Sequence, residues 1–461
     1  MSSPATIPAA TTVKTESYRV AGGYKIVDRW FNVPLDYSSP TSETIVVFAR
    51  SAIPNKSNDD GESGAKMPYA VYLQGGPGFE CGPPNSHPLT NFLFEKGYQL
   101  LYLDQRGTGL STIITPATLA RDHRLSKNRT VQEQARYLKH FRADNIVRDC
   151  EAIRKVLLDN EKWTVVGQSF GGFCATAYLS LHPEGLKEVF TAGGMPPLVR
   201  NPDEVYRRTY KKVESRNAVY YEKYPQDIAN VKSILRHLSA SEVLLPSGGI
   251  LTSRRFMGLG LGFGGHGGID SIHFLVQHAV GDLELFKELT YKTLQSIEAH
   301  QSFDGNIIYA IGHETIYCQG EASRWSANRV LQDQSPLFVL DNIAQKPEAE
   351  PVYFTGEMVY PWMFDDYAEL RKVKEVATIL AHDADWTQLY DESKLAENTV
   401  PVYAATYVED MYVDFEFARE TAAKIKGAKE FITNAMFHNA IRNKTEGVMA
   451  ELWKLKVGEV D

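Results

Sequence analysis

The sequence predicts an α/β protein with a mostly parallel central sheet, helices on both faces of that sheet and a large helical insertion. First, helical patterns alternate with short apolar stretches, as in parallel strands joined by crossover helices. Second, this alternation stops over 197–397, where helical, tyrosine-rich and glycine-punctuated sequence takes its place. Third, a glycine-flanked serine follows one of the apolar stretches. The stretches lie near 69–73, 99–103, 163–167, 188–192 and 400–408.

The chain divides accordingly into a core and an inserted region. We expect a flexible tail over 1–16, a core formed by 17–196 and 398–461, and a helical lid over 197–397 between the two core segments. The tail lacks the basic segment and apolar stretch of a secretory signal. Antiparallel strands before the parallel part are predicted at 24–27 and 44–49, and helices of the lid at 203–238 and 271–302.

The helix before the third parallel strand has the clearest periodicity. Ile146, Cys150, Ile153 and Leu157 repeat at helical spacing and predict an amphipathic helix that leads into the strand at 163–167. Cys150 is therefore expected to be a buried packing residue.

The strand at 163–167 runs into Gly-Gln-Ser-Phe-Gly at 167–171, and a second helical pattern follows. Glycines on either side of Ser169 let the backbone carry the serine on a strained turn with its hydroxyl exposed, as in a nucleophile elbow. The motif alone is equally compatible with a structural turn, but the strand, turn and helix around it favour catalysis. This context predicts an α/β-hydrolase fold with Ser169 as the nucleophile.

The strand at 69–73 runs into Gln-Gly-Gly-Pro-Gly at 74–78. Such glycines allow backbone N–H groups to converge on one point, as an oxyanion hole requires. Gly-Pro clusters are also common in plain turns. A position about 90 residues before the elbow is nevertheless typical of α/β-hydrolases. We expect the N–H groups of Gly76 and Phe170 to bind the oxyanion.

The catalytic acid and base of this fold follow the nucleophile in the order acid, then histidine. Asp410 lies just after the last predicted strand, and His438 is the only histidine after His382. Ser169, Asp410 and His438 would then form a triad. Glu409 and Asp414 remain alternative acids.

Residues 104–111, Asp-Gln-Arg-Gly-Thr-Gly-Leu-Ser, form a polar loop after the strand at 99–103. Asp104 and Arg106 are expected to form an ion pair that fixes this loop. Together with the Gly-Gly-Pro-Gly loop and the elbow, in this order, the segment resembles the proline iminopeptidase family of α/β-hydrolases. The resemblance spans nearly the whole chain and is weaker in the lid. Gln74 stands where bacterial members often carry His.

The resemblance implies a serine aminopeptidase that releases N-terminal proline, or another small residue, from peptides without a metal or cofactor. Such an enzyme must bind a cationic N-terminus, so a carboxylate should face the nucleophile. Glu314, with Tyr317 in a Glu-x-x-Tyr segment, resembles the lid glutamate that binds the amine in this family, and Glu357 is the second candidate. Most glutamates are solvated surface charges, and the surrounding aromatic residues are equally compatible with a lid core. An esterase, an amidase or a tailoring hydrolase of peptide-like metabolites with the same triad is the alternative.

Composition narrows the partners. The net charge of −8 and the absence of a Lys/Arg stripe argue against nucleic acid, and no apolar run reaches the roughly 18 residues of a membrane helix. We expect a cytoplasmic protein with free thiols, small peptides or amides with a free N-terminus as substrates, and no metal; a homo-oligomer is compatible with the sequence. A formal G-x-G-x-x-G match at 258–265 lacks a preceding strand and is interpreted as a lid loop. The cysteines are Cys81, Cys150, Cys174 and Cys318.

Overall fold

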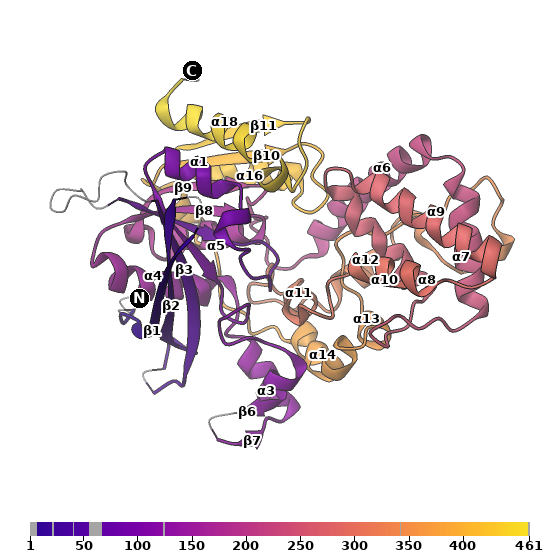
Figure 1. The fold of residues 1–461 in the computed structure, drawn as a ribbon, viewed down its shortest axis with the longest axis horizontal. Coiled ribbons are helices and arrows are strands. Elements are labelled where there is room, and N and C mark those ends of the chain that lie inside the picture. Colours follow the sequence, from indigo (N-terminus) through magenta and orange to yellow (C-terminus); the bar gives the residue numbers. More distant parts are fainter. Residues whose placement is uncertain are drawn as a thin grey trace.

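The computed structural model describes residues 7–20, 23–39, 41–54, 67–122, 125–341 and 343–459. A nine-stranded sheet forms the centre of the core, in the order β1-β2-β3-β5-β4-β8-β9-β10-β11 (Figure 1). Antiparallel pairs join β1, β2, β3 and β5, and parallel pairs join the strands from β5 to β11. The predicted α/β class is confirmed. The strands are β1 (Thr11–Val20), β2 (Tyr24–Pro34), β3 (Thr44–Pro54), β4 (Tyr69–Leu73), β5 (Gln99–Asp104), β8 (Trp163–Gln168), β9 (Leu186–Ala192), β10 (Val402–Tyr407) and β11 (Ala428–Thr433).

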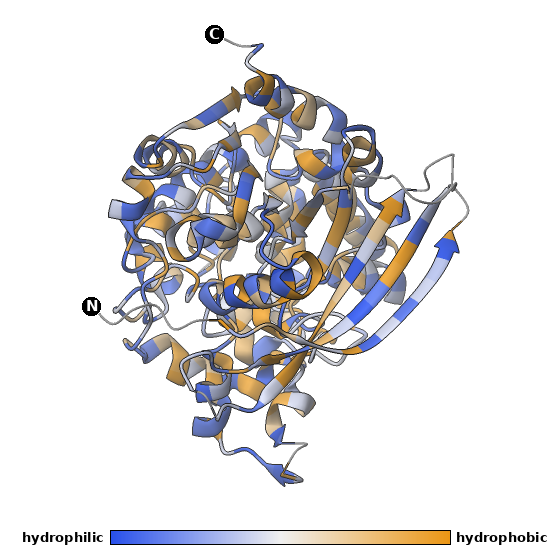
Figure 2. Cartoon of the chain, turned by 90° about the vertical axis from the view of Figure 1, so that its left-hand side faces the viewer, coloured by the Kyte–Doolittle hydropathy of each residue, from blue (hydrophilic) through white to orange (hydrophobic). Residues whose placement is uncertain are grey.

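Alternate residues of the parallel strands face two hydrophobic layers, because successive side chains of a strand point to opposite faces of its sheet. Val71 and Val165 pack with α4 (Ala143–Leu158) and α5 (Phe170–Leu181) on one face. Tyr72 and Val166 pack with α1 (Leu89–Glu95) and α18 (Thr445–Val457) on the other. Figure 2 shows the hydrophobic segments gathered in the interior of the molecule. β4, β5, β8 and β10 are buried at every residue, as expected for parallel strands covered on both sides.

The expected flexible tail over 1–16 is wrong from residue 7 onward, and residues 1–6 lie outside the described residues. β1 pairs with β2 from Thr11 opposite Asn32 to Val20 opposite Tyr24. Ile7 is buried, and the N–H of Ala10 donates to the carbonyl of Ala152 in α4 at 3.0 Å. The polar composition of this segment indicated a tail because β1 is an edge strand with exposed side chains. Backbone hydrogen bonds to β2 hold it in place.

The region 197–397 is helical and lies between β9 and β10. In Figure 1 it stands to the right of the sheet, and its α11 lies next to the core. Each long helix predicted there is divided in two: Pro225 separates α6 from α7, and Lys287, with φ of 63°, ends α9. The helices are α6 (Asp203–Lys223), α7 (Asp227–Ala240), α8 (Ser253–Met257), α9 (Gly268–Phe286), α10 (Tyr291–Ala299), α11 (Ile307–Gly312), α12 (Ser326–Leu331), α13 (Met363–Asp366), α14 (Lys374–His382) and α15 (Glu392–Ala396).

The predicted ion pair between Asp104 and Arg106 does not form. Arg106 instead makes a bidentate pair with Asp149 of α4, with Nε–Oδ2 and Nη2–Oδ1 distances of 2.7 and 2.5 Å. Asp104 accepts hydrogen bonds from the N–H groups of Cys81 and Leu110. The side chains of Asp104 and Arg106 point in different directions on this tight loop. Arg106 therefore pairs with a carboxylate of α4, far along the chain. The four cysteines are free thiols, as expected.

Candidate active site

Ser169 lies at the sharp turn between β8 and α5, with φ of 54° and ψ of −124°. A positive φ at a residue other than glycine stores strain of about 1–3 kcal/mol, which persists only where the surroundings enforce it. The surroundings here are glycines in close contact. A Cβ on Gly171 would lie 2.6 Å from the carbonyl carbon of Leu73, and one on Gly172 would lie 2.6 Å from the Cα of Gly194. Only glycine therefore fits at these two positions after the turn.

Asp410 and His438 form a buried pair beyond the ends of β10 and β11. The Nδ1 of His438 lies 2.7 Å from the Oδ2 of Asp410. The other oxygen of Asp410 accepts hydrogen bonds from the N–H groups of Tyr412 and Val413, at 2.9 and 3.0 Å. These two bonds fix the carboxylate, and the carboxylate in turn fixes the orientation of the imidazole ring.

The two alternative acids point elsewhere. Glu409 lies 3.3 Å from the Nζ of Lys212. Asp414 caps α16 (Phe415–Lys424) by accepting a hydrogen bond from the N–H of Phe417 at 3.0 Å. Neither has a hydrogen bond to His438 among the described residues, so the geometry favours Asp410 as its partner.

Gly193 and Gly194, directly after β9, lie between the backbone of Ser169 and the pair of Asp410 and His438. A Cβ on Gly193 would lie 3.0 Å from the Nδ1 of His438 and 3.2 Å from the Oδ2 of Asp410. A Cβ on Gly194 would lie 2.9 Å from the carbonyl oxygen of Ser169. The backbone of Ser169 and the pair of Asp410 and His438 therefore adjoin two consecutive residues at the carboxyl end of β9. Gly193 and Gly194 are not among the predicted site residues, and their place directly after a predicted strand is the sequence signal for them.

The pKa of His438 is raised above its ordinary value. Burial alone would lower it, but the charge of Asp410 and its hydrogen bond oppose burial, and the charge of Glu357 adds to the effect. The site therefore stabilises a protonated imidazole, which is the form that a general base reaches after taking a proton.

The glycine loop after β4 lies between the elbow and α11. A Cβ on Gly75 would lie 3.0 Å from the Cβ of Ser169, and one on Gly78 would lie 2.9 Å from the backbone nitrogen of Tyr309. Gly76 has a φ of +131°, which a side chain disfavours. Phe170, at the first position of α5, is buried beside the nucleophile. The loop and the start of α5 thus both adjoin Ser169.

Glu357 lies among tyrosines that also adjoin the acid and base. The hydroxyl of Tyr309 donates to its Oε1 at 2.5 Å. Burial, and after it the charges of Glu357 and Asp410, raise the pKa of Tyr317 and of Tyr412. The ring of Tyr317 also packs at 5.9 Å from that of Phe173 in α5. Tyr317 therefore packs against the helix that follows Ser169 and feels the charges of both Glu357 and Asp410.

Glu314 is more enclosed than Glu357. It is 5% exposed, and its two oxygens accept hydrogen bonds from the N–H groups of Ser326 and Ala327, at 3.2 and 2.9 Å. Burial raises the pKa of Glu314 to about 7, against these hydrogen bonds. The carboxylate is therefore tied to the start of α12, whereas the charge of Glu357 is among those that raise the pKa of His438.

Comparison with known proteins decides the family. The profile of the alpha/beta hydrolase fold family matches residues 71–234. Proline iminopeptidase aneH of Aspergillus aculeatus is 44% identical over 438 residues, which cover 94% of this chain and 93% of the relative. The chain belongs to the proline iminopeptidase family. A proline iminopeptidase of Aeromonas sobria is 39% identical over 437 residues, 95% of this chain and 97% of its own. The solved proline iminopeptidase of Mycobacterium smegmatis has 13% identity and a TM-score of 0.40 over 89% of this chain and 95% of its own.

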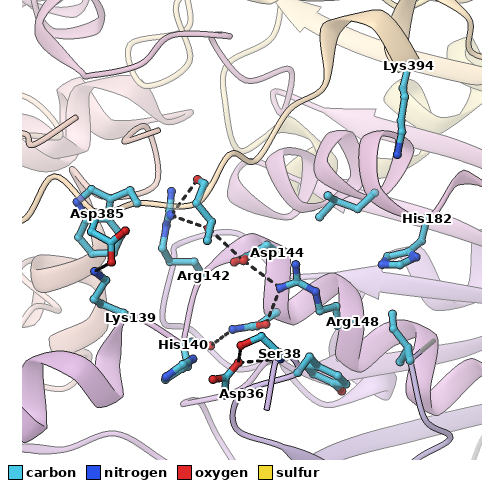
Figure 3. Close-up of a pocket in the computed structure, with 16 residues that line it drawn as sticks. Asp36, Ser38, Lys139, His140, Arg142, Asp144, Arg148, His182, Asp385 and Lys394 are labelled. Atoms are coloured by element: carbon cyan, nitrogen blue, oxygen red, sulfur yellow. Dashed lines mark hydrogen bonds and ion pairs between the residues drawn. The ribbon is translucent and has the colours of Figure 1, made fainter. Parts of the chain in front are cut away.

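This member of the proline iminopeptidase family has a cavity of about 470 Å³, lined by residues of both the core and the helical region (Figure 3). None of the triad residues lines it. Arg142, at the start of α4, donates from Nη2 to the carbonyl of Cys318 at 2.5 Å and from Nη1 to Thr387. Because Cys318 directly follows Tyr317, this arginine connects the core to the segment that carries Glu314 and Tyr317.

In the described part of the chain, no helix is long and apolar enough to cross a membrane, and no cluster of three or more His, Cys, Asp or Glu residues has the arrangement of a metal site.

Proposed function

We propose that the protein is a serine aminopeptidase that releases N-terminal proline, or another small residue, from short peptides. The observation that carries the proposal is the buried 2.7 Å pair of His438 and Asp410 beside the strained elbow of Ser169, with Glu357 acting on the same imidazole. Family membership supports the substrate class.

In the proposed reaction Ser169 attacks the carbonyl carbon of the first residue of the peptide. His438 accepts the serine proton at Nε2, because its Nδ1 is bound to Asp410. The N–H groups of Gly76 and Phe170 stabilise the oxyanion. The imidazolium then gives its proton to the departing amine, which leaves an acyl-enzyme. Water attacks this ester, with His438 as the base again, and frees the N-terminal residue.

Recognition of the free amine falls to carboxylates in the helical region. Glu357 would pair with the cationic amine, and Tyr317 would form part of the apolar wall around the side chain of the first residue. Glu314 would act as the second carboxylate, from a position where α12 holds it. A desolvated carboxylate beside a cationic amine gives a strong, charge-assisted hydrogen bond.

The helical region 197–397 would act as a lid, because α11 rests on the glycine loop beside Ser169 and its Tyr309 binds Glu357. The free thiols are in keeping with a cytoplasmic location.

Replacement of Glu357 by Gln tests the assignment of the amine site. We expect kcat/KM for proline p-nitroanilide to fall roughly 100-fold, because a desolvated amine loses its charged partner. A neutral p-nitrophenyl ester should be affected far less. Glu375→Gln, an exposed change in the same region, is the control. Equal losses on both substrates would instead favour an esterase-like activity with no amine recognition.

A further inference from the structure

A cavity of about 480 Å³ adjoins the glycine loop next to Ser169, and Phe79 in its lining packs 5.0 Å from the ring of Tyr309, the tyrosine that binds Glu357. It is lined mainly by polar and charged side chains, in contrast to the aromatic surroundings of Glu357. Its lining includes Gln74, Phe79, Glu80, His87, Asn306 and Arg442.

Gln74 connects the lining of the cavity to the loop beside Ser169. Gln74 is buried and directly precedes Gly75, whose missing Cβ would lie 3.0 Å from the Cβ of Ser169. Asn306 directly precedes α11, the helix against which the glycine loop packs. The cavity thus adjoins both ends of the glycine loop, at Gln74 and at Phe79.

Arg442, another residue of the lining, lies close in sequence to His438. Arg442 lies in α17 (Ala440–Asn443), one helical turn after His438, and is exposed. Its charge opposes protonation of His438 and contributes, after burial, to the lowered pKa of His87, about 4. Arg442 therefore brings its positive charge both to His438 and to the cavity that it lines, and His87 is an uncharged part of the lining at neutral pH.

We propose that this cavity is the leaving-group subsite, and that Arg442 binds the C-terminal carboxylate of the amino acid or short peptide that departs. The inference rests on the proposed function and adds its preference for the departing group. Arg442 lines the cavity and lies in α17, the helix that directly follows the His438 segment, so the group that His438 protonates would leave beside Arg442. An arginine fork matches a carboxylate with two parallel hydrogen bonds, and Gln74 and Asn306 can bind peptide groups. Glu80 is the carboxylate that would disfavour an acidic side chain in the same cavity.

The test compares two substrates that differ only at the far end, the dipeptide Pro-Gly and its amide Pro-Gly-NH₂. The ratio of kcat/KM for Pro-Gly to kcat/KM for Pro-Gly-NH₂ is the quantity measured. Any effect of Arg442 on His438 changes both values and cancels in this ratio. Arg442→Gln should lower this ratio about 10- to 100-fold, as expected for the loss of a bidentate bond to a charged group. Arg442→Lys should recover part of it, and Glu80→Gln should raise it.

Lys444→Gln is the matched control, because it removes an exposed positive charge two residues further along the chain. An unchanged ratio in Arg442→Gln, or an equal change in Lys444→Gln, would overturn the inference and leave the proposed function standing. A wild-type protein that hydrolyses neither prolyl substrate would overturn the proposed function itself, and with it this inference.

Discussion

The backbone of Gly264 lies directly against the ring of Tyr412, so that a Cβ on this glycine would come within 2.6 Å of the tyrosine hydroxyl. That hydroxyl donates to the carbonyl of Leu261 at 2.5 Å. The same ring meets the imidazole of His438 edge to face, with centroids 4.7 Å apart. The glycine-rich segment Gly258–Gly264 therefore supports His438, the proposed catalytic base, through Tyr412, in place of the nucleotide role that its pattern suggests formally.

Gly264→Ala should displace Tyr412 and loosen His438. Overpacking of this kind costs about 1–3 kcal/mol, so we expect a loss of roughly 10-fold or more in kcat. Gly258→Ala is the control in the same segment, because its nearest neighbour would lie 3.9 Å away. Steady-state kinetics with melting temperatures separate a local effect from unfolding. Equal activity of the two variants would show that Tyr412 does not support His438.

Asp410→Asn should leave the fold intact and reduce kcat by about 10³- to 10⁴-fold, because an amide does not hold the required imidazole tautomer or stabilise the imidazolium. Glu409→Gln and Asp414→Asn serve as controls, since these side chains bind Lys212 and the start of α16. A larger loss in either control would assign the acid to that residue.

The pH dependence follows from the raised pKa of His438. Catalysis needs the neutral imidazole, so kcat/KM should rise with pH through a midpoint above the ordinary histidine value. The same shift contributes stability that is fully present below the unfolded-state pKa and is lost as pH rises through the folded-state pKa. Because Glu357 raises this pKa, Glu357→Gln should move the midpoint down. The rate of fluorophosphonate labelling of Ser169 against pH measures it without the amine substrate, and a midpoint that does not move would place Glu357 away from His438.

Arg142→Ala should destabilise the protein, since Arg142 is 5% exposed and its loss leaves the carbonyl of Cys318 unpaired. We expect about 2–4 kcal/mol in the free energy of unfolding. KM for proline substrates should rise as well, because the segment with Tyr317 loses its link to the core. Arg136→Ala, an exposed position on α3 (Val131–Leu138), is the control in urea unfolding. A loss of stability equal to the control would contradict this role.

Local sequence patterns predicted the parts of the fold that depend on local geometry. The turn at Ser169 and the strand before it follow from neighbouring residues, and the order along the chain singled out Asp410 and His438. The contacts that complete the site join distant segments, as between Gly193 and His438, Gly264 and Tyr412, or Arg142 and Cys318. No spacing along the chain encodes them. The two wrong predictions, the ion pair of Arg106 and the flexible tail, have the same origin. Arg106 pairs with a carboxylate of α4, and β1 is held by its pairing with β2.

The most direct test of the account is kcat/KM on proline p-nitroanilide beside its N-acetylated analogue, with Ser169→Ala as the inactive control. Acetylation removes the positive charge that Glu357 is proposed to bind and leaves the scissile bond unchanged. The account predicts turnover of the free amine and a loss of roughly 100-fold or more on acetylation. Equal turnover of both compounds, or activity that survives Ser169→Ala, would contradict it.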